Sequence, residues 1–408
     1  MTKKDIIMVI PGACAQIPLI KAIHNSGYKV VCVNPYKDSP AFEFSDYSEC
    51  YDILDVESCV RVAEKYNVCA VMSDQCDIAM PPLAAVSERL KLNSIGTELA
   101  ELYTNKYAMR DFSKKNGFPF PKYARCETVE EALSFFETLK SKKMIIKPLD
   151  SNSSRGVFTI NNKKELEALF DKSLAFSKIM KAVICEEYIE GTEFTVDGIA
   201  LNGKHYSLAV SQKSHFAYNP NIACELYFSY DNADFDYDAL RKQNDRYVEK
   251  SGLPFGFTHA EYKFDGEKFV LIEIGARGGG NYISSHIVPI MNDIDNYKIL
   301  IDSTLGATRN DNYGLSEKSG YPKRCCVLKF FDIDKTNSGK TLREIKGENI
   351  LSDNKKVLLY SFNVKAGEQV NNAENDSKRI GFYIAYGDTR EELDSLMKLI
   401  DNNVRFVF

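Results

Sequence analysis

The chain has 408 residues, 44% of them hydrophobic and 27% charged, and its formal net charge is -5 at pH 7. This length predicts two or three domains with substantial cores, and the composition is ordinary for a soluble globular protein. The small negative charge provides no basic field for nucleic acid or an anionic membrane, so we expect small molecules as partners. No apolar stretch reaches the ~20 residues of a membrane helix, and the N-terminus does not look like a signal peptide, so we expect a cytoplasmic location.

The eleven cysteines are scattered through expected strands and helices, and no two of them have CxxC spacing. We therefore expect reduced thiols, most of them in the core, rather than disulfides. The five histidines show neither the HxxxH nor the HxH spacing. The sequence therefore argues against a zinc site.

The first 95 residues alternate short apolar strands with helical patterns. Strands are predicted at residues 6–10, 29–33 and 69–72, and helices at about residues 15–26 and 57–66. Such alternation is typical of a parallel sheet with helices on its faces. The Pro-Gly-Ala turn at residues 11–13 lacks GxGxxG spacing, which argues against a dinucleotide-binding loop.

From residue 97 onward the pattern changes, and the polar stretch 310–323 marks a second boundary. Helices are predicted at about residues 97–116, 129–140, 163–180, 281–290, 296–305 and 389–402. Strands are predicted at about residues 144–147, 156–160, 183–187, 257–264, 268–274, 325–331, 357–362 and 381–386. We therefore predict three domains, at residues 1–95, 96–320 and 321–408.

The two strands at residues 257–264 and 268–274 flank Asp265-Gly266, which is a strong hairpin signal. If the loop holds three residues, Phe264 pairs with Lys268, and one strand face becomes largely apolar. The other face then carries His259, Glu261, Leu271 and Glu273. Glu261 and Glu273 would be diagonal cross-strand neighbours, roughly 7–8 Å apart at the backbone.

Two carboxylates at this spacing repel each other unless a cation lies between them. Their hard oxygen ligands suit Mg²⁺ or Mn²⁺, and Mg²⁺ is commonly held by one or two carboxylates plus phosphate oxygens. The alternative is a solvated acidic hairpin face. After Glu273 the chain continues through Arg277 and the glycines 278–280 toward a predicted helix, whose N-terminus offers an anion site.

Two further polar clusters follow apolar strands. Lys147 ends the strand Met-Ile-Ile-Lys, and the next loop, residues 150–156, is rich in small hydrogen-bond donors that suit phosphate oxygens. The alternative here is a hairpin turn with an exposed lysine. Residues 185–193, Cys-Glu-Glu-Tyr-Ile-Glu-Gly-Thr-Glu, join another strand to the next. Basic, mixed and acidic clusters at three strand ends are what a nucleotide triphosphate and its metal require.

The order of Lys106, Ile-Ile-Lys-Pro, Glu-Glu-Tyr-Ile-Glu-Gly-Thr-Glu, His-Ala-Glu and Glu-Ile-Gly-Ala-Arg resembles the ATP-grasp superfamily over the whole chain. This superfamily includes biotin carboxylase, D-alanine ligases and bacterial L-amino acid ligases. The resemblance implies an α/β fold with a parallel pre-ATP-grasp domain, an ATP-grasp domain whose mobile lid spans about residues 120–187, and a carboxylase-like α+β domain at the C-terminus.

The resemblance also implies roles for individual residues. Lys106 and Lys147 would hold the α and β phosphates, and the loop with Ser153, Ser154 and Gly156 would fold over the β and γ phosphates. The backbones of Glu186 and Ile189 would meet adenine, with Glu187 and Tyr188 beside the ring and Glu193 on the ribose hydroxyls. Glu261 and Glu273 would bind Mg²⁺ or Mn²⁺, with two ions expected.

Two features depart from the family pattern. Members often have asparagine two residues after the second metal-binding glutamate, and here that position is Gly275. Glu273 would then bridge two ions, or water would supply the missing oxygen. The segment 211–230, with His215, Tyr218 and Glu225, matches no substrate pattern, so the substrate stays open.

The implied reaction is ATP-dependent ligation, in which a carboxylate attacks the γ-phosphate and an amine displaces phosphate from the acyl phosphate. Two Mg²⁺ ions, Lys106, Lys147 and Arg277 would neutralise the transferring group. Arg277 would bind the carboxylate or the acyl phosphate, the alternative being a salt bridge to Glu261 or Glu273. His259 would orient a ligand or act as a base, the alternative being a structural histidine.

Two other functions stay open at this point. One is a carboxylase that uses bicarbonate through carboxyphosphate, and the other is a nucleotide-binding protein without catalysis. In each case the partners are small molecules, with a carboxylate and an amine for the ligase. A homodimer is the usual form of the family.

Overall fold

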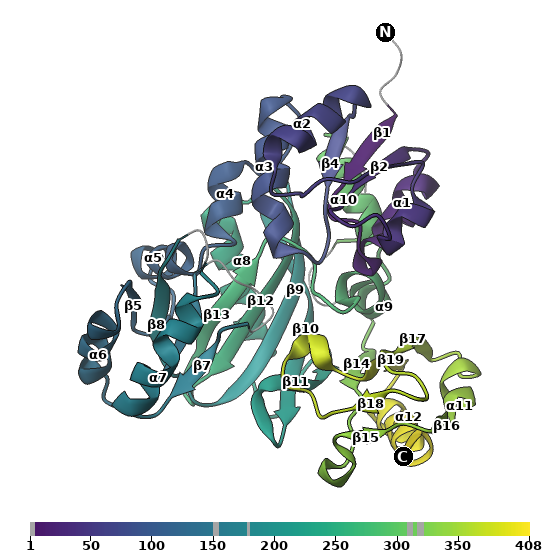
Figure 1. Ribbon diagram of the computed structural model, residues 1–408. Coiled ribbons are helices and arrows are strands. Elements are labelled where there is room, and N and C mark those ends of the chain that lie inside the picture. Colours follow the sequence, from purple (N-terminus) through teal and green to yellow (C-terminus); the bar gives the residue numbers. More distant parts are fainter. Residues whose placement is uncertain (1–4, 150–154, 178–179, 308–312, 316–321) are drawn as a thin grey trace.

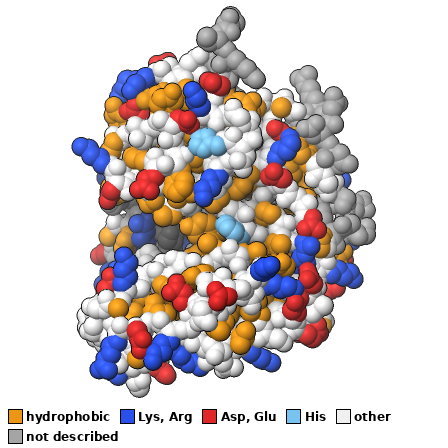
Figure 2. Space-filling view, turned by 90° about the vertical axis from the view of Figure 1, so that its right-hand side faces the viewer, with side chains coloured by type: hydrophobic (Ala, Val, Ile, Leu, Met, Phe, Trp, Pro, Cys, Tyr) orange, Lys and Arg blue, Asp and Glu red, His pale blue; other side chains and the backbone are white. Residues whose placement is uncertain are grey.

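The computed structural model describes residues 5–149, 155–177, 180–307, 313–315 and 322–408. Figure 1 shows the N-terminal region at the top, a smaller lid at the lower left and the C-terminal region at the lower right, all joined to a long central sheet. On the face seen in Figure 2, acidic and basic side chains are interspersed rather than gathered by sign. Within the described part of the chain, no helix has the length and apolar character needed to cross a membrane.

The N-terminal region contains the predicted parallel sheet, in the order β3-β2-β1-β4. Its strands are β1 (Ile6–Val9), β2 (Lys29–Val33), β3 (Tyr47–Glu49) and β4 (Ala70–Met72), with helices α1 (Ile17–Asn25), α2 (Val56–Lys65) and α3 (Met80–Arg89). Strand β3 and helix α3 were not predicted. Tyr-Ser-Glu has no apolar run, and α3 begins with Met-Pro-Pro, where proline is tolerated because the first amides have no helical partner.

The helix predicted at residues 97–116 is in fact two helices, α4 (Thr97–Leu102) and α5 (Lys106–Asn116). Asn105 caps α5, because its side chain accepts hydrogen bonds from the amides of Tyr107 and Ala108. Lys106 is therefore the first helical residue of α5.

The lid has its own sheet, ordered β5-β8-β6-β7, and its own core around Phe136, Ile146 and Phe170. Its elements are β5 (Tyr123–Cys126), α6 (Val129–Thr138), β6 (Met144–Pro148), β7 (Phe158–Ile160), α7 (Lys163–Leu174) and β8 (Val183–Glu187). A separate core is what a movable lid needs. The predicted closure of residues 120–187 stays a prediction.

The central sheet has the order β13-β12-β9-β10-β11-β14-β19-β17 among the described residues, so C-terminal strands continue it. Its strands are β9 (Thr192–Leu201), β10 (Lys204–Phe216), β11 (Asn219–Phe228), β12 (Phe255–Phe264), β13 (Phe269–Gly275), β14 (Cys325–Phe330), β17 (Val357–Phe362) and β19 (Gly381–Gly387). Its helices are α8 (Tyr237–Ser251), α9 (Val288–Asn292), α10 (Asn296–Thr304), α11 (Glu348–Ser352) and α12 (Arg390–Asn403). Two small ladders pair β15 (Lys340–Thr341) with β18 (Gln369–Val370) and β16 (Glu344–Lys346) with β20 (Arg405–Val407).

The predicted pairing of Phe264 with Lys268 is wrong, because Phe264 pairs with Phe269. The Asp265 side chain accepts hydrogen bonds from the amides of Glu267 and Lys268, which lengthens the turn by one residue. A register shift between Glu261 and Tyr262 then places Glu261 directly opposite Glu273 rather than diagonal to it. On the turn side of this bulge, Leu271 pairs with Tyr262 and lies in the apolar core. The prediction that Leu271 shares a face with the two glutamates is therefore wrong.

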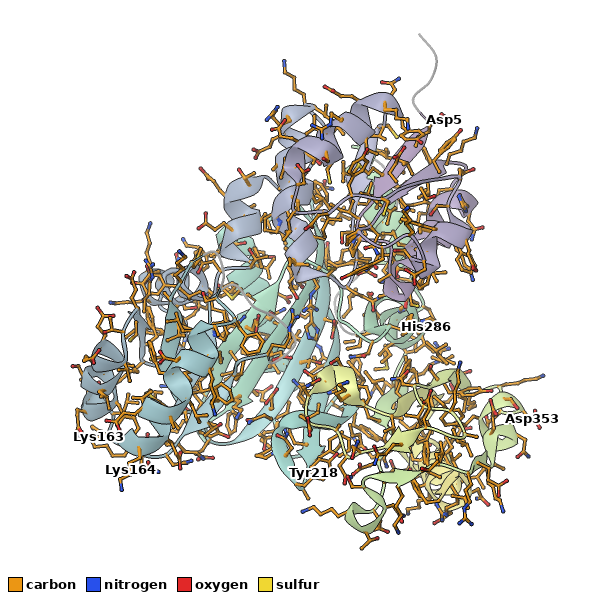
Figure 3. All side chains as sticks on the ribbon, in the orientation of Figure 1. Asp5, Lys163, Lys164, Tyr218, His286 and Asp353 are labelled. Atoms are coloured by element: carbon orange, nitrogen blue, oxygen red, sulfur yellow. The ribbon has the colours of Figure 1, made fainter. Side chains whose placement is uncertain are left out.

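The β10 and β11 hairpin contains much of the segment 211–230, whose role the sequence left open. Figure 3 shows Tyr218 at the end of this hairpin, beside the C-terminal region. The Tyr218 hydroxyl donates to Asp332 at 3.2 Å, and Arg379 donates to the Ala223 carbonyl at 3.0 Å. This end of the hairpin therefore joins two regions of the molecule.

Candidate active site

One face of the central sheet gathers charged side chains from neighbouring strands. Asp197 on β9 pairs with His259 on β12, and Glu261 on β12 pairs with Glu273 on β13. Because directly paired residues point to the same side of a sheet, these four side chains share a face. The opposite face carries Phe194, Tyr262 and other apolar residues and is packed in the core.

Lys213 on β10 lies between two acidic residues of this face. Its Nζ is 2.6 Å from Glu193 Oε1 and 2.9 Å from Glu261 Oε1. Burial alone would lower the pKa of Lys213, but the two carboxylates raise it well above its usual value. Lys213 is therefore a fixed cation at the site, and it was not among the predicted residues.

Glu193, the predicted ribose acceptor, is ionised and held in place. His215 Nε2 lies 3.3 Å from Glu193 Oε2, whereas Lys213 contacts the other carboxylate oxygen, Oε1. Burial would raise the pKa of Glu193, but Lys213 and then His215 lower it to about 2. An ionised carboxylate is an acceptor only, as two ribose hydroxyls require.

His259 is held by Asp197, with 2.9 Å between Nδ1 and Oδ1, while its Nε2 lies 3.9 Å from Glu261 Oε1. Burial would lower the pKa of His259, but Asp197 and Glu261 raise it to about 9. A ring that already carries its proton at neutral pH cannot accept another one. Of the two predicted roles, this geometry favours orienting a ligand over acting as a base.

The two predicted phosphate lysines are both buried, and each has a carboxylate partner. Lys106 Nζ is 2.9 Å from Glu273 Oε1, and Lys147 Nζ is 2.8 Å from Glu186 Oε2. Lys106 comes from α5 and Lys147 from the lid strand β6. Burial would lower the pKa of Lys106, but Glu273 and then Asp77 raise it, so this lysine is charged.

The Glu186 carboxylate also accepts a hydrogen bond from Arg110 Nε at 2.5 Å. Burial would raise the pKa of Glu186, but Arg110 and Lys147 lower it to about 2. The side chain of Glu186 is therefore fully occupied, which agrees with a nucleotide contact through its backbone alone. Sequence reasoning missed Arg110, although its position one helical turn after Lys106 put both cations on one face of α5.

In the predicted adenine segment, the ring of Tyr188 is covered by two lysines from other parts of the chain. Lys143 Nζ and Lys263 Nζ lie 3.9 Å and 4.7 Å from the centre of the Tyr188 ring. Lys263 also donates to the Ile189 carbonyl at 3.2 Å. Of the predicted phosphate loop, Ser153 and Ser154 lie outside the described residues. Gly156 is described and has a positive φ of 73°, a conformation that favours glycine.

Arg277 pairs with Asp77 of the N-terminal region, at 2.9 Å from Nε and 2.8 Å from Nη2, rather than with Glu261 or Glu273. Burial would lower the pKa of Arg277, but Asp77 raises it above its usual value. Asp77 was not predicted as a site residue. It precedes Arg277 by 200 residues, so no local pattern connects the two.

Two glycines after Arg277 let buried carboxylates approach the backbone. A Cβ on Gly278 would lie 2.3 Å from Asp74 Oδ1, and one on Gly279 would lie 2.3 Å from Asp197 Oδ1. The helix expected near residue 281 begins later, as a π-helical turn at Ile283–Ile287. The Tyr282 amide already donates to Gln75 at 2.8 Å, so this helix start has a protein partner where an anion was predicted.

Among the described residues, no group of three or more histidine, cysteine, aspartate or glutamate side chains is arranged as a metal cage. The paired Glu261 and Glu273 offer two carboxylates on one face. Mg²⁺ is usually held by one or two carboxylates, with substrate phosphates and water as its other ligands. The donor set therefore fits a Mg²⁺ ion that arrives with a nucleotide.

An ATP-grasp domain model matches residues 140–285, which include Lys147, Glu186, Glu261 and Glu273. The chain is similar to dapdiamide A synthase of Enterobacter agglomerans, at 24% identity over 293 residues that make up 69% of each chain. It is also similar to alanine–anticapsin ligase of Bacillus subtilis (strain 168), at 29% identity over 180 residues, which are 39% of this chain and 38% of that one.

Among solved structures, the L-amino acid ligase of Bacillus licheniformis matches with a TM-score of 0.79 and 19% identity, covering 100% of this chain and 99% of that one. Biotin carboxylase of Campylobacter jejuni matches with a TM-score of 0.72 and 15% identity, covering 99% and 92%. These likenesses confirm the fold predicted from the sequence.

The parallel N-terminal sheet, the lid and the acidic sheet face together form an α/β fold that the chain shares with these solved structures. The chain contains an ATP-grasp domain over residues 140–285. It is an ATP-dependent ligase of the kind that forms carbon-nitrogen bonds.

Proposed function

We propose that this protein joins a small carboxylic acid or amino acid to an amine through an acyl phosphate, releasing ADP and phosphate. One observation carries the proposal: Glu261 and Glu273 lie directly opposite each other, and the buried Lys106 contacts one of them. Such a face can hold a cation and a triphosphate together. A structural ion-pair network alone does not require two carboxylates to face each other.

The lysines and carboxylates would exchange partners when nucleotide binds. Without nucleotide, Lys106 and Lys147 neutralise Glu273 and Glu186. A triphosphate carries more negative charge than one carboxylate, so its oxygens would compete for these lysines, and Glu273 would become available to a divalent cation once they take Lys106. Mg²⁺ or Mn²⁺, with two ions expected, would supply positive charge to the β and γ phosphates.

Lys106 and Lys147 would hold the α and β phosphates, and Glu193 would accept the ribose hydroxyls. Arg277 would bind the attacking carboxylate or the acyl phosphate, because a planar guanidinium suits both anions. His259, fixed by Asp197, would donate a hydrogen bond toward a bound ligand. Closure of the lid would exclude water, which otherwise hydrolyses the acyl phosphate.

The names of the relatives support an amino acid as one substrate. One is an alanine–anticapsin ligase, and a neighbour that spans the whole chain is an L-amino acid ligase. We propose the same substrate class here, together with a second small acid or amine. The cytoplasmic location expected from the sequence and the homodimer that the resemblance implies stay predictions.

The test is ADP release with ATP, Mg²⁺ and a panel of acids and amines, including single amino acids, amino-acid pairs and bicarbonate. The substrate pair that gives turnover is then used with ¹⁸O in its carboxylate. An acyl phosphate requires one ¹⁸O atom to move into the released phosphate, which mass spectrometry detects. Bicarbonate-dependent, amino-acid-independent ADP release would instead establish a carboxylase, and no release with any pair would leave a nucleotide-binding protein.

A further inference from the structure

The Asp77 carboxylate accepts two hydrogen bonds from one edge of the Arg277 guanidinium. Nε and Nη2 donate to the two carboxylate oxygens of Asp77, and Nη1 donates to the Gly278 carbonyl at 3.0 Å. A guanidinium has five N–H donors in one plane, and partners in the described part of the chain take three of them. One N–H on Nη1 and one on Nη2 are left as donors for an oxyanion.

The absence of a side chain at Gly275 leaves room for the Asp77 carboxylate beside Arg277. Gly275 lies on β13 between Glu273 and Arg277, opposite His259, and its backbone is not in the left-handed region. A Cβ at this position would lie 2.5 Å from Asp77 Oδ1 and 3.3 Å from Arg277 Nε. A glycine in a strand often marks a site where another group approaches the backbone closely. Here the approaching group is the Asp77 carboxylate.

Asp77 is also electrostatically part of the site. Burial would raise the pKa of Asp77, but Arg277, Lys106 and His259 lower it. The carboxylate is therefore ionised, with three positively charged groups of the site around it. The residue begins the short turn Asp77–Ala79 directly after β4, at the carboxyl edge of the N-terminal sheet. The N-terminal region therefore reaches the site with a charged side chain.

We propose that Asp77 is a positioning residue, which fixes Arg277 so that its two remaining N–H donors face the reacting carboxylate, and that Gly275 is glycine to admit Asp77. The inference rests on the proposed function, since that function gives Arg277 its anion. It adds a residue that acts through Arg277 rather than on the substrate.

The first test compares Asp77→Ala and Asp77→Asn with the native enzyme in steady-state kinetics, varying acid and ATP separately. We expect kcat/KM for the acid to fall ~100-fold in Asp77→Ala and less in Asp77→Asn, since a 1 Å misplacement costs about that much. The KM for ATP should stay within about threefold. A lower KM for the acid would overturn the inference, because Asp77 would then be occupying the acid site rather than preparing it.

The second test asks whether Asp77 acts through its two neighbours. In an Arg277→Ala background, Asp77→Ala should cost no further activity, because its target is gone. Gly275→Ala should lower activity in the native chain and cost almost nothing more in Asp77→Ala, where the clashing carboxylate is absent. Additive losses in both cycles would overturn the inference.

The same variants are also compared by thermal unfolding, which needs no turnover. If the native enzyme releases no ADP with any acid and amine, the proposed function fails. The three-residue arrangement is then judged from stability alone. Non-additive stability changes for Asp77, Arg277 and Gly275 support the arrangement, and additive changes contradict it.

Discussion

Glu261 and Glu273 lie directly opposite each other on two paired strands, and each carboxylate contacts a different lysine. Lys213 Nζ lies 2.9 Å from Glu261, and Lys106 Nζ lies 2.9 Å from Glu273. Without nucleotide, the negative charge of each glutamate is therefore neutralised by its own lysine. This arrangement predicts how metal and nucleotide binding depend on each other.

Mg²⁺ alone should stabilise the protein little, whereas Mg²⁺ with ADP should stabilise it by more than the two separate shifts together. The reason is that the lysines compete with the metal until phosphate oxygens take Lys106. Thermal unfolding with Mg²⁺, with ADP and with both gives the comparison, since a ligand that binds only the folded state raises the midpoint. A large shift with Mg²⁺ alone would show that the carboxylates are available without nucleotide.

Replacing Lys147 by alanine should abolish nucleotide binding or lower turnover by ~100- to 1000-fold, the usual cost of losing one charge-stabilising donor. Calorimetric titration with ADP and Mg²⁺ and the rate of ADP release measure the two effects. Cys325→Ser is the control, because this buried residue of β14 belongs to the hydrophobic core of the C-terminal region, away from the proposed site. Its turnover should stay intact, and equal losses in both variants would point to a general folding defect.

The ion pairs of Glu186 predict how stability depends on acid pH. Its pKa is about 2 in the folded protein, against ~4.3 for an unperturbed glutamate. The unfolded chain therefore binds this proton first, so the stabilisation is fully present above ~4.3 and is lost as pH falls toward about 2. It amounts to something on the order of 3 kcal/mol.

Denaturant unfolding of Glu186→Gln and the native protein, at pH 7 and at steps down to pH 3, measures this contribution. The difference between their unfolding free energies should shrink as the pH falls. Glu57→Gln is the control, because the exposed pair of Glu57 with Arg89 should contribute only ~0–1 kcal/mol. A difference that does not change with pH would contradict the low pKa of Glu186.

Much of the fold could be predicted because it is local. Alternating apolar patterns gave the parallel N-terminal sheet, and the two runs around Asp265-Gly266 gave the hairpin and the shared face of its glutamates. The hairpin register could not be obtained, because the longer turn and the bulge beside Glu261 depend on side-chain hydrogen bonds and packing.

Lys213 shows the same limit at the site. The hairpin turn at Asn202-Gly203 pairs Leu201 with Lys204, and an undistorted ladder from there would pair Glu193 with Gln212. A bulge between Ser207 and Ala209 moves the register by one, so that Lys213 faces Glu193. Asp77 is a different case, because only the tertiary fold joins it to Arg277.

The glycines after Arg277 predict a contrast between neighbouring positions. Gly278→Ala should destabilise the protein by roughly 1–3 kcal/mol, because its Cβ would meet Asp74 at 2.3 Å and Ser284 at 2.4 Å. Gly280→Ala is the matched control, since a Cβ there would have no heavy atom within 4 Å. Thermal unfolding separates the two, and equal midpoints would show that the loop adapts without cost.

The most direct test of the account is the rate of ADP release, as Mg²⁺ is titrated, in Glu273→Gln and Glu267→Gln. Both positions belong to the same hairpin, but Glu267 is exposed at its turn and faces no other carboxylate across the ladder. We predict that Glu273→Gln loses at least ~100-fold in turnover at every Mg²⁺ concentration, while Glu267→Gln behaves as the native protein. Native turnover in Glu273→Gln would contradict a catalytic cation at the paired glutamates.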